Sequence, residues 1–431
     1  MHQANDVVIS WIKENTIPLT TLDPQAPLDD LAPISQIVGN ASLVALGEAS
    51  HGGHEFFVMK HRLLRFLVEK MGFTLFAMEM SWMQAEAIND YVLTGTGDAR
   101  SLLRKNTYRV WNTQEVLDLI EWLRAYNADA HHTQKVHFAG FDSVSPTAAG
   151  LDRIVEYVQK VDPQFSAQVA TLYHGMDEIS LLELPEPPVR QRFVEAAEQV
   201  YERLKEHEHE YIARSSPSAY TYILQEARVV KQVTLLIRHA DARLHSDELR
   251  TKAQQRDHFM AENIHWLHEH AIGGEKMVLW AHNWHIGTWG EWRGERSGKI
   301  FPFTWMGIDL RQRYHDDYLT IGFSFFEGAH NAVLMDQEGN VIGPRQAYTL
   351  VPASQESYEH TLTRAGKLYL LDLRSVPVGE VSAWLDGPHP FRDFGAIHIE
   401  EGRYRNLSLT RWFDVLVHIG KISPTQLLPK A

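Results

Sequence analysis

The chain of 431 residues contains no cysteine. This absence excludes disulfide bonds, a catalytic thiolate, cysteine-ligated zinc and iron–sulfur clusters. If the protein is an enzyme that uses a nucleophile, that nucleophile is therefore a serine, a threonine, a carboxylate or an activated water molecule.

Positive charge is also scarce. The chain carries 55 Asp and Glu residues against 41 Lys and Arg residues, which gives a formal net charge of −14. An electrostatic field of this sign repels phosphate backbones and anionic membranes. We therefore expect neither a nucleic-acid partner nor a membrane partner.

Long apolar runs and a targeting segment are missing as well. No stretch approaches the run of about 18 apolar residues that crosses a membrane. The N-terminal stretch, MHQANDVVISWIKENT, has neither a basic region nor a small-residue cleavage site. We expect a soluble cytoplasmic protein, and the sequence leaves its oligomeric state open.

Several catalytic signatures are absent from the sequence. It has no G-x-S-x-G nucleophile elbow, no phosphate-binding G-x-x-x-x-G-K-[ST] loop, no H-E-x-x-H zinc helix and no G-x-G-x-x-G turn. These absences disfavour a serine hydrolase, a P-loop nucleotidase, a zinc protease and a dinucleotide-binding enzyme.

The sequence does contain short apolar runs separated by segments of helical period, and these runs cover residues 42–46, 73–78, 136–140, 277–280 and 318–323. Apolar runs of this kind are typical of strands that are buried on both faces of a parallel sheet. We therefore predict an α/β fold with three layers, in which helices cover both faces of a mostly parallel sheet.

Between residues 147 and 272 the strand pattern disappears, and long segments of helical period take its place over 188–211, 217–241 and 250–270. We interpret this region as a helical insertion or cap over the sheet. The predicted organisation is a first part of the α/β core over residues 1–146, the helical region over 147–272, and a second part of the core over 273–431.

The first candidate site follows the strand predicted at 42–46. Here the sequence Gly-Glu-Ala-Ser-His-Gly-Gly places Glu48 three residues before His51 in a glycine-rich turn between a strand and a helix. A carboxylate at this spacing can orient a neutral imidazole, which then removes a proton from water as a general base. The alternative is that both side chains only satisfy backbone groups of the loop.

Two further strand ends carry the same residue types. Glu79 ends the run at 73–78, where a carboxylate is costly unless it is paired or lies at the edge of the sheet. His282 and His285 follow the run at 277–280, although hydrogen bonding at a strand end could also explain them. Because the carboxyl ends of parallel strands share one edge of a sheet, we expect these residues to lie near His51.

The sequence resembles the erythromycin esterase family in several ordered motifs, which together run from about residue 40 to residue 325. The motifs are Gly47-Glu48-Ala49-Ser50-His51-Gly52, residues 62–68, Met78-Glu79, Gly140-Phe141-Asp142, Arg256-Asp257, residues 260–263, residues 281–285 and Met306-Gly307.

This resemblance implies a three-layer α/β fold and hydrolysis of the ester in fourteen-membered macrolide antibiotics without a required metal or other cofactor. It implies that His51 activates water and that Glu48, Glu79 and His285 are the other catalytic residues. His282 matches a neighbouring histidine of the family and is predicted to contact the small-molecule ester substrate.

Two further residues are predicted to bind the substrate. Lys60 stands where family members often carry arginine, and it keeps the charge but loses the planar fork of the guanidinium. It is one candidate donor to the oxyanion of the reaction, together with the turn at Gly52-Gly53 and His285. Trp284 suits either a wide apolar substrate pocket or packing in the protein interior.

Two other classes of function fit the same residues. The cluster of Glu and His side chains offers nitrogen and oxygen ligands, so a metal-dependent hydrolase is one alternative. A non-catalytic protein that binds a ligand or haem through the histidines is the other. Metal analysis, activity after chelation and the absorbance of protein supplied with haem distinguish these alternatives from a metal-independent esterase.

Overall fold

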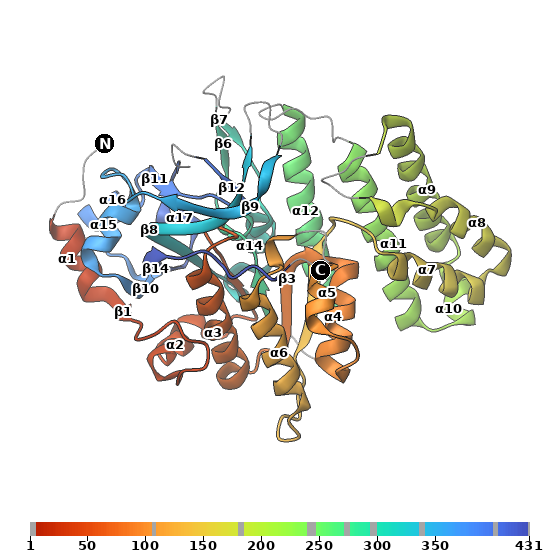
Figure 1. Ribbon diagram of the computed structural model, residues 1–431, viewed down its shortest axis with the longest axis horizontal. Helices are drawn as coiled ribbons and strands as arrows, with labels where there is room; N and C mark the ends of the chain where they lie inside the picture. Colours follow the sequence, from red (N-terminus) through yellow and green to blue (C-terminus); the bar gives the residue numbers. More distant parts are fainter. Residues whose placement is uncertain are drawn as a thin grey trace.

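The computed structural model describes residues 6–105, 109–179, 185–238, 247–270, 276–293, 300–335, 341–399 and 404–429. A ten-stranded sheet crosses the molecule, and its main path follows the order β1-β10-β14-β8-β2-β5-β3-β4 (Figure 1). In this order the strands are β1 (Thr16–Pro18), β10 (Leu368–Asp372), β14 (Val415–Ile422), β8 (Tyr318–Met335), β2 (Leu43–Leu46), β5 (Met277–Trp280), β3 (Leu75–Ser81) and β4 (His137–Asp142).

The strands from β14 to β4 are parallel to one another, whereas β1 and β10 are antiparallel to their neighbours. The prediction of a mostly parallel sheet within an α/β fold is therefore confirmed. The remaining strands of the sheet, β9 (Val341–Leu350) and β12 (Ile397–His398), pair with the long strand β8. Two small ladders join β6 (Glu291–Arg293) to β7 (Ile300–Pro302) and β11 (His389–Arg392) to β13 (Tyr404–Leu407).

Helices lie between and beside these strands (Figure 1). They are α1 (Asp6–Asn15), α2 (Ile34–Val38), α3 (His54–Met71), α4 (Trp82–Thr94), α5 (Ala99–Arg104), α6 (Gln114–Ala128), α7 (Ala148–Val161), α8 (Pro163–Tyr173), α9 (Pro187–Glu206), α10 (Glu208–Arg214), α11 (Pro217–Arg238), α12 (Asp247–His270), α13 (Asn283–Ile286), α14 (Met306–Tyr314), α15 (Tyr358–Ala365), α16 (Glu380–Leu385) and α17 (Leu409–Trp412).

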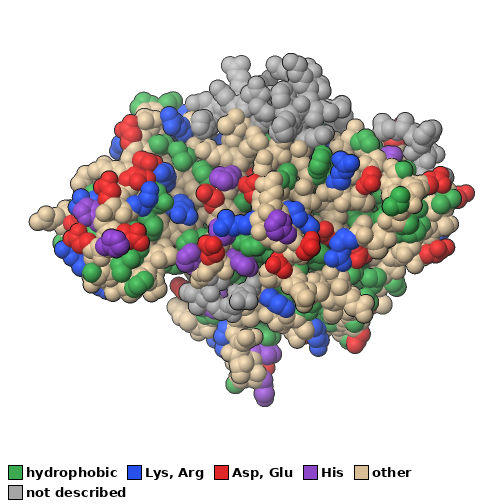
Figure 2. Space-filling view, turned by 180° about the vertical axis from the view of Figure 1, so that it is seen from behind, with side chains coloured by type: hydrophobic (Ala, Val, Ile, Leu, Met, Phe, Trp, Pro, Cys, Tyr) green, Lys and Arg blue, Asp and Glu red, His purple; other side chains and the backbone are tan. Residues whose placement is uncertain are grey.

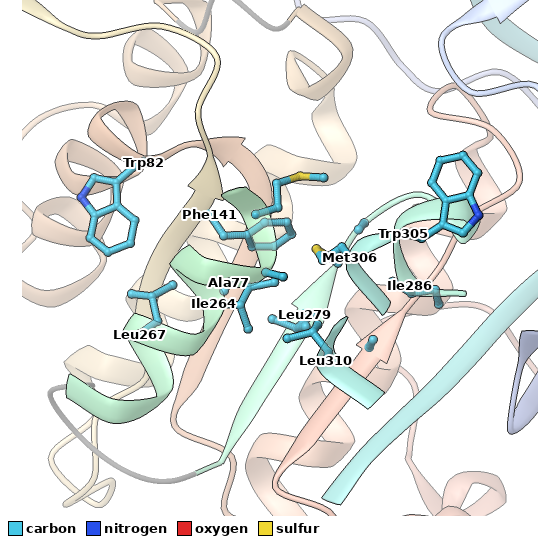
Figure 3. Close-up of a cluster of buried hydrophobic side chains, with 14 of the residues drawn as sticks. Ala77, Trp82, Phe141, Ile264, Leu267, Leu279, Ile286, Trp305, Met306 and Leu310 are labelled. Atoms are coloured by element: carbon cyan, nitrogen blue, oxygen red, sulfur yellow. The ribbon is translucent and has the colours of Figure 1, made fainter. Parts of the chain in front are cut away.

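The two faces of the sheet are packed by different helices. Successive side chains of a strand point to opposite faces, so Leu43 and Ala45 join one apolar cluster while Val44 and Leu46 join the other. The first cluster includes side chains of α1, α12 and α14, and the second includes side chains of α2, α3 and α6. Figure 3 shows part of the first cluster, where strand residues such as Leu279 meet Ile264 of α12 and Leu310 of α14.

The helical stretch expected between residues 147 and 272 is formed by α7 to α12. Figure 1 shows α7 to α11 gathered at one side of the molecule, with α12 between them and the sheet. The segment predicted as one helix over 188–211 is divided into α9 and α10, because the backbone leaves the helical conformation at His207. The end of the segment predicted over 217–241 lies outside the described residues.

The strand predicted over 318–323 continues as β8 to residue 335. Polar Ser324 does not end it, because the Ser324 hydroxyl hydrogen-bonds to Nδ1 of His418 on the neighbouring strand β14 at 2.9 Å. A buried polar side chain is tolerated within a strand when a neighbouring strand supplies its partner.

The surface view in Figure 2 shows acidic, basic and histidine side chains mixed across the middle of one face. In the described part of the chain, no helix has the length and apolar character needed to span a membrane.

Candidate active site

The loop between β2 and α3 brings Glu48 and His51 together. Two of its glycines allow close approach of other segments, because a Cβ atom at Gly47 would collide with the Asn283 side chain and one at Gly52 with the Asn331 backbone. In this loop Oε1 of Glu48 lies 2.9 Å from Nδ1 of His51, and both residues are buried. The Glu48 carboxylate accepts a hydrogen bond from the Nδ1–H of His51, which leaves the lone pair of the neutral ring on Nε2.

Lys60, on α3, holds the other oxygen of the same carboxylate. Its Nζ donates to Oε2 of Glu48, lies 3.4 Å from the carbonyl oxygen of Ala281 and sits 3.9 Å from the ring centroid of Trp280. The side chain is fully buried, and burial lowers its pKa to about 8 against the opposing effect of Glu48. Lys60 therefore fixes the carboxylate that orients His51.

Glu79 lies in β3 and is surrounded by donors. Its Oε1 accepts a hydrogen bond from Nη2 of Arg256 at 2.8 Å, and its Oε2 accepts one from the backbone N–H of His282 at 3.0 Å. Burial alone would raise the pKa of Glu79, but His285, His51 and Arg256 together lower it well below its usual value. Glu79 is therefore a permanent carboxylate at neutral pH.

Arg256, on α12, connects Glu79 to a second carboxylate. Its Nη2 also lies 2.5 Å from Oδ2 of Asp142, the last residue of β4, and its Nε lies 3.1 Å from Oδ1 of Asp142. The guanidinium thus joins two neighbouring strands of the sheet to the helix that packs on them.

His285, on the short helix α13, lies between two carboxylates. Its Nδ1 is 2.8 Å from Oδ1 of Asp257, and its Nε2 is 3.4 Å from Oε1 of Glu79. Burial disfavours the charged ring, but Asp257 and Glu79 outweigh it and raise the pKa of His285 to about 10. The His285 ring is therefore an imidazolium at neutral pH.

His51 has the opposite protonation behaviour. Burial lowers the pKa of His51 below its ordinary value, although the hydrogen bond to Glu48 acts in the other direction. The site therefore contains a neutral histidine that can accept a proton and a cationic histidine that can stabilise negative charge. Environments that move the pKa values of paired groups apart are typical of acid–base catalysis.

His282 lies between these two histidines. Its ring centroid is 5.1 Å from that of His51 and 6.5 Å from that of His285. Its Nδ1 accepts a hydrogen bond from the backbone N–H of Trp284 at 3.4 Å, and its Nε2 lies 2.8 Å from Oδ1 of Asp393.

Trp284 lies next to this site in sequence and packs among other aromatic rings. Its ring centroid is 4.7 Å from that of Trp305 and 6.5 Å from that of Trp412, and the guanidinium of Arg405 lies over its face. The side chain is 9% exposed, so its packing contacts account for most of its surface. Contact between Trp284 and a substrate stays a prediction.

The structure thus brings Glu48, His51, Glu79, His282 and His285 into one buried cluster, and it adds four residues that the candidate list lacked, namely Asp142, Arg256, Asp257 and Asp393. Asp142, Arg256 and Asp257 all stand in motifs of the family resemblance. Asp393 carried no sequence signal, and it lies in the loop after β11.

The carboxylates of the cluster already have cationic or N–H partners from the protein. Lys60 and His51 hold Glu48, and Arg256 and the His282 backbone hold Glu79. Among the described residues, no group of three or more His, Asp or Glu side chains has the arrangement of a metal site.

Comparisons with known proteins identify the family of this chain. A profile of the family described as erythromycin esterase matches residues 68–422. The chain is 27% identical over 375 residues to erythromycin esterase type II of Escherichia coli, and the match covers 83% of this chain and 86% of that protein.

Two solved structures have the same fold. A Bacillus cereus protein is 30% identical, with a TM-score of 0.85 over 99% of this chain and all of its own. A mutant of the erythromycin esterase EreC in its open conformation is 17% identical, with a TM-score of 0.72, and the match covers 96% of this chain and 99% of that one.

Proposed function

We propose that this chain, which belongs to the erythromycin esterase family, hydrolyses the macrolactone ester of fourteen-membered macrolide antibiotics with water activated by His51. The observation that carries the proposal is the pair of histidines with opposite protonation behaviour at the carboxyl ends of parallel strands, of which His51 is buried and His285 is 12% exposed. Ester hydrolysis needs a base for water and a positive group for the oxyanion.

In the proposed reaction, Nε2 of His51 removes a proton from water as the water oxygen attacks the ester carbonyl. Glu48 keeps the proton of His51 on Nδ1 and stabilises the imidazolium that forms, and Lys60 holds Glu48 in place. Collapse of the tetrahedral intermediate breaks the ester C–O bond, and His51 returns its proton to the leaving alkoxide. The products are a carboxylate and a hydroxyl on one opened ring.

His285 is the group best suited to donate a hydrogen bond to the oxyanion. The predicted donors at Gly52 and Lys60 already have partners, since the Gly52 N–H donates to the Ser50 hydroxyl at 3.2 Å and Lys60 donates to Glu48. The contact from Nε2 of His285 to Glu79 is 3.4 Å, which is longer than an ordinary hydrogen bond. This weakly held N–H of a cationic ring can turn to the developing negative charge.

The macrolide substrate is inferred from the name of the E. coli relative and from charge. The net charge of −14 attracts a cationic substrate such as a macrolide with an amino sugar. We assign no metal to the reaction, because Lys60 and Arg256 occupy the carboxylate oxygens that a metal-dependent hydrolase would need as ligands.

A panel of macrolides and simple esters, incubated with the protein and analysed by mass spectrometry, tests this function. The proposal predicts a gain of one water in fourteen-membered macrolides, with and without exhaustive chelation. If only small esters were cleaved, the result would support the esterase reaction and contradict the macrolide substrate. Loss of activity on chelation, restored by a metal, would favour the metal-dependent hydrolase instead.

A further inference from the structure

A cavity of about 240 Å³ lies at the junction of the sheet edge and the helical region, away from the catalytic cluster. It is lined by the edge strand β4 and by side chains of α4, α7, α11 and α12. Leu75 and His137, which begin β3 and β4, belong to its wall, which extends along β4 to Gly140, two residues before Asp142. Ligand pockets often form at such junctions between structural units.

Aromatic rings form one part of the wall. Trp82 and Trp266 meet edge to face with ring centroids 5.3 Å apart, and Tyr222 lies 6.3 Å from Trp266. Figure 3 shows Trp82 and Leu267, both lining residues, at the end of the apolar cluster opposite to Trp305. The faces of such rings attract cations through their quadrupoles.

Carboxylates form the other part of the cavity wall. Glu86 of α4 lines the cavity, and both of its carboxylate oxygens are buried. It forms an ion pair with Arg153, which also binds Oε1 of the buried Glu226 at 2.5 Å. Asp90, one turn further along α4, lies at the cavity as well.

These charges do not balance. Arg153 is a single cation shared by Glu86 and Glu226, so one of these two carboxylates needs either a proton or a bound cation. Burial and the neighbouring Glu226 raise the pKa of Glu86 well above its usual value, and burial raises that of Glu226 to about 7. A buried acidic pair that holds a proton where it lacks a counter-ion is one of the features that mark binding sites.

We propose that this cavity binds a small organic ammonium ion, with the carboxylate of Glu86 as its counter-ion and the three aromatic rings as its walls. The indole N–H of Trp82 is buried without an acceptor among the described residues. A hydroxyl oxygen on the ligand would supply that acceptor. An ammonium alcohol such as choline combines both features.

The cavity is independent of the proposed catalysis. Along α12, Trp266 follows Arg256 by ten residues, which corresponds to about 15 Å of helix. The lining residues include no member of the catalytic cluster. Binding of the ammonium ion should therefore persist in a protein that has lost its catalytic base.

Calorimetric titration of the full-length protein with choline, tetramethylammonium and ethanolamine tests the proposal. We expect saturable binding of at least one of these cations and none of the uncharged alcohol in which carbon replaces the nitrogen of choline. Glu86→Gln should weaken binding at least about tenfold, the effect of about 1.4 kcal/mol. Tyr222→Leu, which leaves the charges in place, should also weaken it.

Glu195→Gln is the matched control, because Glu195 is an exposed residue of α9 that bonds to Gln191. This variant and His51→Asn should bind the cation as the wild type does, and Glu86→Gln should keep the hydrolytic activity. Absence of saturable binding for all three cations would overturn the proposal. Equal binding by wild type and Glu86→Gln, or equal binding of the uncharged alcohol, would overturn it too.

Discussion

Glu79 and Arg256 lie 177 positions apart in the chain and form a hydrogen-bonded ion pair of 2.8 Å. The pair connects β3, which lies beside the edge strand β4, to α12, the helix that closes the helical region. Arg256 also hydrogen-bonds to Asp142, and its Nη1 lies 3.3 Å from Nε2 of His285, so this guanidinium positions the two carboxylates beside His285.

Replacement of Arg256 by lysine should impair catalysis although the charge is kept. One ammonium nitrogen cannot reproduce the contacts that the guanidinium makes with Glu79 and Asp142 together. We expect a fall in kcat/KM of about tenfold to hundredfold, or about 1.4–2.7 kcal/mol. Steady-state kinetics checks this, with Arg311→Lys as a control, since Arg311 pairs with Asp414 outside the site. Equal losses in both variants would contradict a specific role.

Asp257→Asn should move the alkaline limit of activity to lower pH. Asp257 helps raise the pKa of His285 to about 10, and the cationic ring is the active form. Activity that depends on this cation is present below its pKa and is lost as the pH rises through it. Removal of a neighbouring negative charge lowers such a pKa by about 1–3 units.

The pH dependence of kcat/KM for wild type and Asp257→Asn measures this shift. Asp309→Asn serves as the control, because Asp309 contacts His258 rather than His285. An unchanged alkaline limb in Asp257→Asn would refute the assignment of the cation to His285.

Lys60→Met should lower the free energy of unfolding. It should also lower the activity at low pH. The substitution leaves the buried Glu48 carboxylate with His51 as its remaining partner at the site, and loss of one member of a buried pair costs about 3–5 kcal/mol. Glu48 would then stabilise protonated His51 more strongly and raise its pKa, so the acid limb of the rate profile should move to higher pH. Denaturant unfolding and pH–rate profiles test this.

Lys70→Met provides the matched control for Lys60→Met, since Lys70 is an exposed residue of the same helix. It should leave both measurements unchanged. A Lys60→Met protein with wild-type stability and an unmoved acid limb would show that Lys60 does not position Glu48.

His418 should make the fold sensitive to acid. It is fully buried, and burial lowers its pKa to about 3. Between that value and the ordinary value of about 6.5, the unfolded chain binds a proton that the folded chain does not, so stability falls as the pH falls. His418→Asn, which can still bond to Ser324, should reduce this slope by about 1.4 kcal/mol per pH unit.

Urea unfolding between pH 6.5 and 5 measures the slope of each variant. His131→Asn is the control, because the His131 side chain is 93% exposed. Identical slopes for the wild type and His418→Asn would contradict the assignment.

The strands and the pairing of Glu48 with His51 could be predicted from the sequence, because both depend on residues that are close together in the chain. The run at 277–280 is apolar throughout and became β5 with the same ends, since a strand buried on both faces favours a continuous apolar run. Glu48 and His51 are three residues apart in one turn, so their contact needs no knowledge of distant segments.

The carboxylate partners of His285 and His282 could not be predicted from local sequence in this way. Asp257 lies on α12, where a charged residue is ordinarily solvent-exposed, and its burial depends on how that helix packs against α13 and α14. Asp393 is still less predictable, because its contact with His282 joins two loops that are 111 positions apart. Tertiary packing rather than local pattern decides both contacts.

The most direct test of the central claim is hydrolysis of erythromycin in water enriched in ¹⁸O, followed by mass spectrometry of the product. If His51 activates water for attack on the lactone carbonyl, the wild type yields a ring-opened acid with one ¹⁸O atom in its new carboxylate. His51→Asn, with an unchanged melting transition, should form this product about 10²–10⁴-fold more slowly. Near wild-type turnover by His51→Asn, or a product without ¹⁸O in the carboxylate, would contradict the mechanism.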